Sequence, residues 1–475
     1  MKEVPQLPTR TERDMLGERE LPAQAYFGIH TLRAVENFWI TETSISNYPE
    51  LIHSLSSIKQ AAALANQELE LLDQTRAEAI VSACKTLREG KHQDQFPVDV
   101  IQGGAGTSTN MNANEVIANL GLEFLGRGKG DYAYLHPNEH VNLSQSTNDV
   151  YPTALKLTAY LGIMGLLETM HTLQSAFQTK AEEFQTILKM GRTQLQDAVP
   201  MTLGQEFGGY AETLGEDIER LEEASMLMRE VNLGGTAIGT GINAHPEYSR
   251  LICRHLSKIL GIELITAPNL VEATQDCGAF VQLSGVLKRI AIKLSKTCND
   301  LRLLSSGPRA GLNEINLPPM QAGSSIMPGK VNPVIPEVVN QVAFEVIGND
   351  VTISMAAESG QLQLNAFEPI IGHSLLKSIT YLRNACATLA ERCVLGITAN
   401  RDILRSQVEN SIGLATALNP YLGYETATEV ATVALRDNRR VYDLVLESGL
   451  LSKEQLDKIL HPSVLTRPHK SPKHH

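Results

Sequence analysis

Four short segments of the sequence concentrate hydroxyl, amide and glycine residues, which are groups that proteins use to bind small anions. They cover residues 103–112 (GGAGTSTNMN), 144–149 (SQSTND), 192–197 (RTQLQD) and 323–333 (GSSIMPGKVNP). Hydroxyls, amides and the free N–H groups at the start of a helix attract anions because their hydrogens carry partial positive charge. A single segment of this kind is more often an ordinary cap or turn. Several together favour a site that binds carboxylates.

The segment at 323–333 lies just before an expected helix. We place Asn332 at the N-cap and Pro333 at the first helical position, with the cation Lys330 beside them. Val331 stands where a phosphate-binding P-loop needs Ser or Thr, and the sequence has no HExxH motif, GxSxG motif or Cys/His cluster. None of the 13 histidines lies in the four segments. The sequence therefore predicts neither a histidine base nor a metal site.

Long helices are expected to position these segments. A first long helix is expected to open at Pro152, and apolar residues then recur at the three- and four-residue spacing of a helix that packs along other helices. The same spacing recurs over 280–304 and 375–393, and less regularly over 207–228, while 333–350 is a fifth candidate. Helices of roughly 25 to 35 residues would be about 40–50 Å long. Rods of this length predict an elongated bundle that associates with copies from other subunits.

Composition restricts the class of protein. The chain has 475 residues, and 41 Lys+Arg against 53 Asp+Glu give a net charge of −12. This acidic balance, without basic blocks, argues against nucleic acid or an anionic membrane as a partner. No apolar run approaches the ~20 residues that a membrane span needs, and residues 1–5 show no secretory signal. The six cysteines form no CxxC pair and are expected to be buried in a reducing compartment, so we expect a soluble, cytoplasmic protein.

Several of these motifs resemble one known family. The segment at 323–333 is similar to the signature loop of the aspartase/fumarase superfamily. Residues 104–116, 144–153 and 191–207 resemble that superfamily's other active-site segments, in the same order along the chain. The runs SSGPRAGLNEINLP (305–318) and PEVVNQV (336–342) resemble aspartate ammonia-lyases more closely than fumarases. The resemblance extends from about Thr11 to His461, which is nearly the whole chain.

The resemblance implies a fold and an activity. The implied fold is mainly α, with three helical domains at 1–147, 148–402 and 403–475. The central long-helix bundle would form a twenty-helix core in a homotetramer, and each active site would use segments of three subunits. The implied reaction is the reversible elimination of ammonia from L-aspartate, giving fumarate. No cofactor is implied, and activation by a divalent cation such as Mg²⁺ is left open.

The resemblance also implies roles for particular residues. Removal of the C3 proton produces an aci-carboxylate dianion, so the main task of the site is to stabilise negative charge. Ser324 would be the general base, acting as an alkoxide, and Asn148 would contact the amino group. Lys330 and Asn332 would hold the α-carboxylate, with Thr193 nearby. The donors implied around the β-carboxylate are Thr107, Ser146, Thr147 and Ser325.

Two further positions would support the site. Fumarases carry His where this chain has Gln194, and that His pairs with a Glu that matches Glu337. Hydroxide needs a proton as it departs, whereas an ammonium group is already protonated, so Gln194 favours an ammonia-lyase. Glu337 is read either as a structural partner for the start of the helix or as part of a proton relay.

Two alternatives remain open from the sequence. The first is a fumarate hydratase, or a lyase for a related amino acid, from the same superfamily. The second is a catalytically inactive helical scaffold. The intact residues Ser324, Lys330 and Asn332 weigh against the scaffold, because a retired site would be expected to lose at least one of them.

Overall fold

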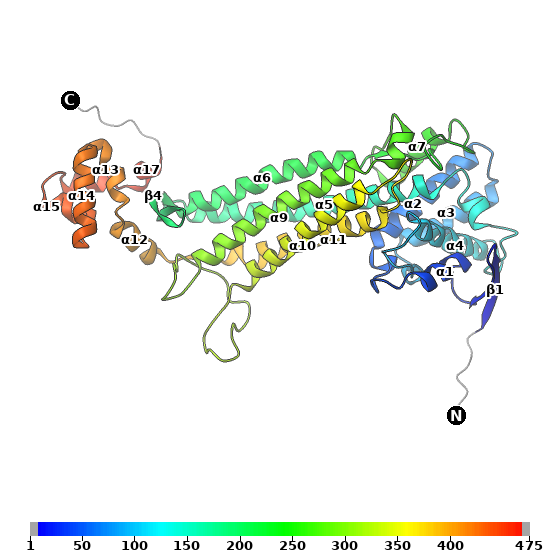
Figure 1. The fold of residues 1–475 in the computed structure, drawn as a ribbon, viewed down its shortest axis with the longest axis horizontal. Helices are drawn as coiled ribbons and strands as arrows, with labels where there is room; N and C mark the ends of the chain where they lie inside the picture. Colours follow the sequence, from blue (N-terminus) through cyan, green and yellow to red (C-terminus); the bar gives the residue numbers. More distant parts are fainter. Residues whose placement is uncertain (1–7, 468–475) are drawn as a thin grey trace. The chain divides into compact units, whose positions relative to one another are not determined.

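A computed structural model describes residues 8–467 and shows a mainly helical chain (Figure 1). The described chain divides into two compact units, each built from three stretches of sequence. Unit 1 comprises Met1–Leu167, Glu219–Arg289 and Glu345–Leu382. Unit 2 comprises Glu168–Ile218, Ile290–Phe344 and Arg383–His475. The sequence features at residues 1–5 lie outside the described residues, and the division into three domains stays a prediction.

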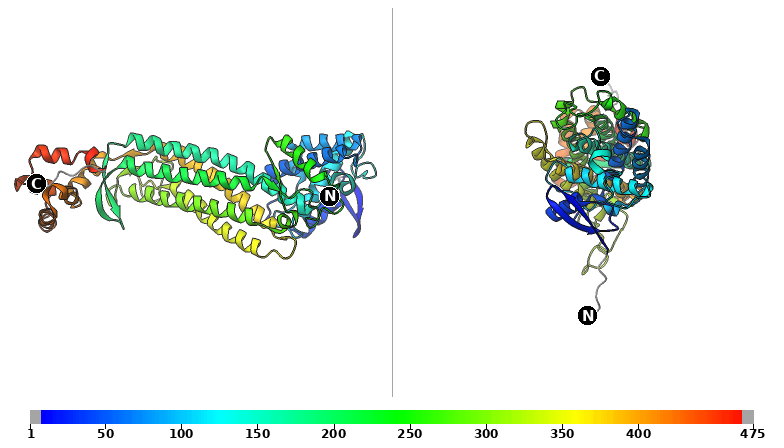
Figure 2. Two further views of the ribbon diagram at one scale, coloured as in Figure 1. Left: turned by 90° about the horizontal axis from the view of Figure 1, so that it is seen from above. Right: turned by 90° about the vertical axis from the view of Figure 1, so that its right-hand side faces the viewer.

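Each unit contains part of five long helices, which confirms the expected long-helix architecture (Figure 2). These helices are α5 (Thr147–Glu183), α6 (Leu203–Leu227), α9 (Gly278–Leu304), α10 (Val334–Glu358) and α11 (Glu368–Arg392). Within unit 1, α5 and α11 approach closely: a Cβ at Gly162 would lie 3.0 Å from Ile379. Apolar seam residues such as Leu166 and Phe177 on α5 are fully buried, and all six cysteines are buried and form no disulfide. The apolar spacing therefore identified the core faces correctly.

The rest of unit 1 consists of shorter helices and two small sheets. Its helices are α1 (Ile29–Asn37), α2 (Pro49–Glu68), α3 (Gln74–Arg88), α4 (Thr107–Phe124), α7 (Tyr248–Leu260) and α8 (Leu270–Gln275), with short turns η1 (Ile45–Asn47), η2 (Gln93–Gln95) and the π-helix η3 (Pro137–Val141). Strands β1 (Thr9–Asp14) and β2 (Gly17–Pro22) form an antiparallel hairpin, and β5 (Glu230–Val231) pairs in parallel with β6 (Ile265–Thr266). Helix α2 packs against α3 and α7 and is buried along most of its length.

The rest of unit 2 is a small helical cluster and two further strand pairs. The helices are α12 (Arg401–Asn410), α13 (Leu414–Leu422), α14 (Tyr424–Asp437), α15 (Val441–Glu447), α16 (Lys453–Ile459) and α17 (Pro462–Leu465), preceded by the turn η4 (Val394–Gly396). Strands β3 (Leu188–Thr193) and β4 (Gln196–Thr202) form an antiparallel hairpin, and β7 (Ile315–Asn316) pairs with β8 (Thr398–Ala399). Buried aliphatic residues of α12 to α16, including Leu418, Val445 and Leu456, form the core of this cluster.

Helix α5 is the one described helix that is long and apolar enough to cross a membrane by length and composition. This differs from the expectation that no segment approaches such a composition. Most of its most apolar window, 67%, is buried inside the structure. Burial of this extent is also found in the core helices of soluble proteins, so the helix alone is weak support for a membrane span.

The N-terminus of α1 is capped by a carboxylate that lies far away in sequence. Helix α1 has no side-chain cap and no acidic residue in its first turn. Glu115, on α4, accepts hydrogen bonds from the backbone N–H groups of Gly28 (2.9 Å), His30 (2.8 Å) and Thr31 (3.1 Å), and from the Thr31 hydroxyl (2.6 Å). Position 28 must be glycine because a Cβ there would lie 2.8 Å from the carboxyl groups of Glu115 and Glu12. Burial raises the pKa of Glu115 to about 7, although these hydrogen bonds favour its ionised form.

We expect Glu115→Gln to lower the free energy of unfolding by about 2–4 kcal/mol, because an amide leaves at least one buried N–H without an acceptor. Thermal melting of the purified protein measures the change. Glu123→Gln, at the end of the same helix, is the matched control, because Glu123 is partly exposed and bonds Lys129 and Tyr26 at the surface. Equal melting temperatures for the two variants would contradict this account of α1.

Candidate functional site

The residues expected to form the active site, namely the general base, the substrate-binding residues and two supporting residues, fall into two groups, one in each unit. Unit 1 contains four of them: Thr107, Ser146, Thr147 and Asn148. Unit 2 contains the other seven: Thr193, Gln194, Ser324, Ser325, Lys330, Asn332 and Glu337.

The first segment forms the N-terminus of α4. Ala105 adopts the left-handed backbone region, with a φ of 53°, between two glycines that do the same. Gly106 cannot carry a side chain, because a Cβ there would overlap the ring of the buried Tyr151. Thr107 opens the helix, and its hydroxyl donates to the carbonyl of Gly104 at 2.7 Å. The Thr107 hydroxyl would have to rotate before it could donate to a ligand.

The second segment forms the N-terminus of α5, which begins at Thr147 and not at Pro152 as expected. Pro152 lies inside the first turns of the helix, where it lacks the N–H that would bond to the carbonyl of Asn148. The side chain of Asn232 donates to that carbonyl instead, at 3.0 Å. Proline is tolerated here because a side-chain amide replaces the missing helical bond.

Asp149 ties the start of α5 to a turn at residues 234–236. Its Oδ1 accepts from the N–H of Ser146 at 3.0 Å, and its Oδ2 accepts from the N–H groups of Gly234 and Thr236, both at 3.0 Å. Burial raises the pKa of Asp149 to about 6, while these backbone donors oppose the shift. The buried amine of Lys59 lies near enough to interact with this carboxyl, and burial lowers the pKa of Lys59 to about 7.

Sequence reasoning missed the groups beneath this segment. Lys59 lies on α2, and its amine donates to the amide oxygens of Asn142 and Gln145, both at 2.9 Å. Asn110 on α4 donates to Thr147 Oγ1 at 3.0 Å. The available signal was the one lysine in the helical run at 51–65, which otherwise contains only apolar and uncharged polar residues and one histidine, because a buried lysine requires polar partners.

The hairpin of β3 and β4 carries Thr193 and Gln194 in unit 2. Thr193 pairs with Gln196, so Gln194 and Leu195 form a two-residue turn, with φ values of 54° and 65°. This conformation is typical of type I′ turns and costs free energy for residues other than Gly, Asn or Asp, and such strain is often found at functional sites. Thr193 and Gln194 are both exposed. The sequence identified the polar segment but not the hairpin.

Buried ion pairs anchor this hairpin. Glu314, beside β7, is fully buried and pairs with Arg192 at 2.5 Å and with Lys189 at 2.9 Å. Lys189 is itself almost fully buried and also pairs with Glu206 on α6, at 2.5 Å. Removing one partner of such a cluster would leave an uncompensated buried charge. The cluster therefore fixes β3 just before the residues expected to reach the substrate.

The fourth segment forms a loop before α10. The N–H of Gly323 donates to the carbonyl of Lys330 at 2.8 Å, and Asn332 Nδ2 donates to the carbonyl of Gly323 at 2.6 Å. The placement of Asn332 as an N-cap is therefore wrong: the helix begins at Val334, and the amide closes the loop instead. A Cβ at Gly323 would collide with the backbone of Lys330 and Asn332, so this closure requires glycine.

Ser324 occupies a distinctive position in this loop. Its Oγ accepts hydrogen bonds from the backbone N–H groups of Ile326 (3.2 Å) and Met327 (2.9 Å). Two N–H donors on one hydroxyl oxygen stabilise negative charge there. Ser325 and Lys330 are exposed. Glu337 lies in the first turn of α10, and its carboxylate forms no ion pair within residues 8–467.

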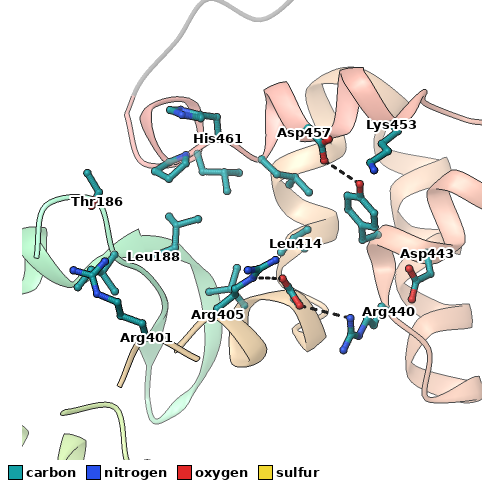
Figure 3. Close-up of a pocket in the computed structure, with 17 residues that line it drawn as sticks. Thr186, Leu188, Arg401, Arg405, Leu414, Arg440, Asp443, Lys453, Asp457 and His461 are labelled. Carbon is teal, nitrogen blue, oxygen red and sulfur yellow. Dashed lines mark hydrogen bonds and ion pairs between the residues drawn. The ribbon is translucent and has the colours of Figure 1, made fainter. Parts of the chain in front are cut away.

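A separate pocket of about 760 Å³ lies among α12, α15, α16, α17 and β3 in unit 2 (Figure 3). Its polar residues largely pair with one another: Arg405 contacts Glu409 at 2.7 Å, and the Tyr442 hydroxyl donates to Asp457 at 2.9 Å. None of the eleven expected site residues lines it. Within residues 8–467, no group of three or more His, Cys, Asp or Glu side chains is arranged to hold a metal ion.

Comparison with known proteins places the chain in a family. A family model described as "Lyase" matches residues 17–348, and one described as "Fumarase C C-terminus" matches residues 414–467. The chain belongs to this lyase family. Its relatives include an aspartate ammonia-lyase of Helicobacter pylori, which is 58% identical over 98% of this chain and 99% of the relative. An aspartate ammonia-lyase of Escherichia coli is 55% identical over 97% of this chain and 96% of the relative. A third, from Pseudomonas fluorescens, is 60% identical over 97% of this chain and 96% of the relative.

Solved structures agree with this placement. A fumarate lyase:delta crystallin from Brucella melitensis, bound to cobalt, matches with a TM-score of 0.95 and 57% identity, covering 97% of this chain and all of that chain. A class II fumarase from Schistosoma mansoni matches with a TM-score of 0.92 and 34% identity, covering 98% of this chain and all of that chain. The mainly helical fold expected from the sequence is therefore confirmed.

Proposed function

We propose that this lyase catalyses the reversible elimination of ammonia from L-aspartate, which gives fumarate. The observation that carries the proposal is similarity over nearly the full length, at 55–60% identity, to proteins named aspartate ammonia-lyase. The protein is then a carbon–nitrogen lyase. All four of its polar segments contribute residues that the reaction needs.

Ser324 is the proposed general base, which removes the C3 proton as an alkoxide. An alkoxide needs donors that stabilise its charge. The N–H groups of Ile326 and Met327 already point at Ser324 Oγ, which supports this role. Exclusion of water when the glycine-flanked loop closes over substrate would lower the cost further.

The remaining expected residues bind the substrate in this proposal. Lys330 and Asn332 hold the α-carboxylate, with Thr193 nearby, and Asn148 contacts the amino group. The β-carboxylate gains charge in the aci-carboxylate intermediate, and hydroxyls are suited to stabilise it. These hydroxyls belong to Thr107, Ser146, Thr147 and Ser325.

Gln194 supports an ammonia-lyase over a hydratase. A protonated amino group departs from carbon as neutral ammonia and needs no further proton. The site therefore needs no acid for the leaving group, and an amide at this exposed turn is compatible with the reaction. Glu337 is proposed as a structural residue at the start of α10. The proposed reaction needs no cofactor, because carboxylate binding and a serine base account for each step. Activation by Mg²⁺ is a separate question that a titration with the metal answers.

We propose a homotetramer in which three subunits contribute to each active site. An exposed apolar face on α10 supports assembly: Phe344, Val351 and Met355 lie on one side of the helix and are 63%, 56% and 66% exposed. A symmetric oligomer would bury such a face against helices of other copies. The proposed location of this assembly is the cytoplasm, as a soluble protein.

The purified protein is expected to form fumarate from L-aspartate and not from L-malate. Fumarate is followed by its ultraviolet absorbance, and ammonia is measured in parallel. Fumarate from malate alone would identify a hydratase. Activity with neither substrate would favour the inactive scaffold.

Ser324→Ala is expected to reduce turnover by at least about 10²–10⁴-fold, because it removes the general base. Ser305→Ala is the matched control, since Ser305 lies on the same connecting segment and its hydroxyl only donates to the carbonyl of Arg302. Both variants should keep the oligomeric state and melting temperature of the wild type. Near-normal turnover in Ser324→Ala would rule out the assignment of the base.

A further inference from the structure

The partly buried amide of Asn142 organises the groups beneath the start of α5. Its Nδ2 donates to the backbone carbonyl of Gln145 at 3.3 Å. A carbonyl oxygen can only accept, so the nitrogen of the amide must face it and Oδ1 must face the opposite way. This oxygen meets three N–H donors: Lys59 Nζ at 2.9 Å, Asn110 Nδ2 at 3.2 Å and Asn114 Nδ2 at 3.1 Å. The orientation of Asn142 is thereby determined by the backbone and reinforced by Lys59.

The amide of Gln145 is fixed in the same manner. Its Nε2 donates to the carbonyls of Val141 and Leu143, both at 3.0 Å, so its Oε1 faces Lys59. Lys59 therefore meets two amide oxygens whose orientation does not depend on its own charge. The direction of every hydrogen bond in this network follows from groups that only accept.

The orientation of Asn142 decides that of Asn110, which is 1% exposed. Only the Nδ2 group of Asn110 can face Asn142 Oδ1, and it donates one of its two hydrogens there. It donates the other hydrogen to Thr147 Oγ1, with 3.0 Å between Nδ2 and Oγ1. Thr147 thus accepts from Asn110. Its own hydroxyl proton meets no acceptor in the described part of the chain, and Thr147 is 9% exposed. The hydroxyl is left to donate outward.

Asn148, the next residue, is left to accept a hydrogen bond and not to donate one. Its Nδ2 donates to the carbonyl of Ala237 at 2.7 Å, so its Oδ1 is left to accept. The turn that presents Ala237 is held by Asp149, through the N–H groups of Gly234 and Thr236. Thr236 has a positive φ of 54°, and its buried hydroxyl has no partner within residues 8–467, so the turn is held in an unfavourable conformation.

We propose that Asn110 and the Ala237 carbonyl are positioning groups that set the polarity of the substrate contacts. Asn110 makes Thr147 a donor to a substrate carboxylate, and Ala237 makes Asn148 an acceptor for the substrate ammonium. A carboxylate can only accept hydrogen bonds and an ammonium can only donate them. A donor at Thr147 beside an acceptor at Asn148 therefore matches a ligand that carries both a carboxylate and an ammonium group, such as an amino dicarboxylate. The inference rests on the proposed function and names residues that would act through Thr147 and Asn148 without touching the substrate.

The test compares Asn110→Asp with Asn114→Asp. Both asparagines lie on α4, are almost fully buried and donate to Asn142 Oδ1, but only Asn110 contacts Thr147. The substitution at 110 places an acceptor where Thr147 needs a donor, so the Thr147 proton turns inward. Calorimetry with succinate, a dicarboxylate without an amino group, should show affinity lower by about 10- to 100-fold, the effect of one hydrogen bond to a charged group. Asn114→Asp should change it by less than about threefold, since Thr147 keeps its donor.

A pH series separates this role from general damage to the fold. Burial raises the pKa of an introduced carboxyl group, and its protonated form donates again. The ratio of the two variants' succinate affinities should therefore approach one as the pH falls from about 8 to 6. Burial places the pKa of Lys59 at about 7 and that of Asp149 at about 6, and both groups are present in the two variants.

The outcomes are distinguishable. Equal loss of affinity in both variants, or no loss at Asn110→Asp, would overturn the inference, as would a ratio that does not change with pH. A wild type that binds succinate but releases no ammonia from L-aspartate would contradict the proposed function alone. In that case the two variants would still test the polarity of Thr147.

Discussion

Side-chain amides must face neighbouring groups that can only accept or only donate with the right atom, and this constraint determines how the start of α5 is built. A side-chain amide carries both kinds of atom, so a single neighbouring carbonyl is enough to decide which way it faces. Gln145 supplies that carbonyl for Asn142, and Ala237 supplies it for Asn148. The amide oxygens of Asn110 and Asn114 are buried without a hydrogen-bond partner within residues 8–467, so the directions in this network are set by the carbonyls that face Asn142 and Gln145. The network therefore leaves the Thr147 hydroxyl free to donate a hydrogen bond and Asn148 Oδ1 free to accept one.

The same constraint explains how an acidic protein can bind dicarboxylates. The chain carries a net charge of −12, which repels anions at long range. Binding must therefore come from local donors. In the proposed site these donors are the hydroxyls of Ser146 and Thr147 at the N-terminus of α5 in unit 1, and Lys330 and the N–H groups around Ser324 in unit 2. The net charge of the chain bears on its solubility, whereas anion binding depends on the positions and directions of local hydrogen-bond donors.

The sequence predicted the long helices and the polar segments because both are encoded locally. Apolar residues at helical spacing, such as Leu166 and Phe177, are buried as expected, and a hydroxyl-rich segment is visible in one dimension. The resemblance to a known superfamily then supplied candidate roles. Three details were predicted wrongly: the start of α5, the cap at Asn332, and the lack of any apolar segment long enough to span a membrane. At Pro152, Asn232, which is distant in sequence, donates to the carbonyl that the proline leaves free. At Asn332, the amide donates to Gly323 within the same loop instead of capping α10. Lys59 and Ala237 were missed because their importance depends on contacts with residues distant in sequence, and Asn142 was missed because its link to Lys59 is of that kind.

Neutron diffraction from a deuterium-exchanged crystal with bound succinate would test the polarity of Thr147 most directly, because it locates hydrogen positions. The account predicts deuterium on Thr147 Oγ1 directed at a carboxylate oxygen of the ligand, and two deuterons on Asn110 Nδ2, one directed at Thr147 and one at Asn142. A Thr147 deuteron directed at Asn110, or an Asn110 oxygen facing Thr147, would contradict it.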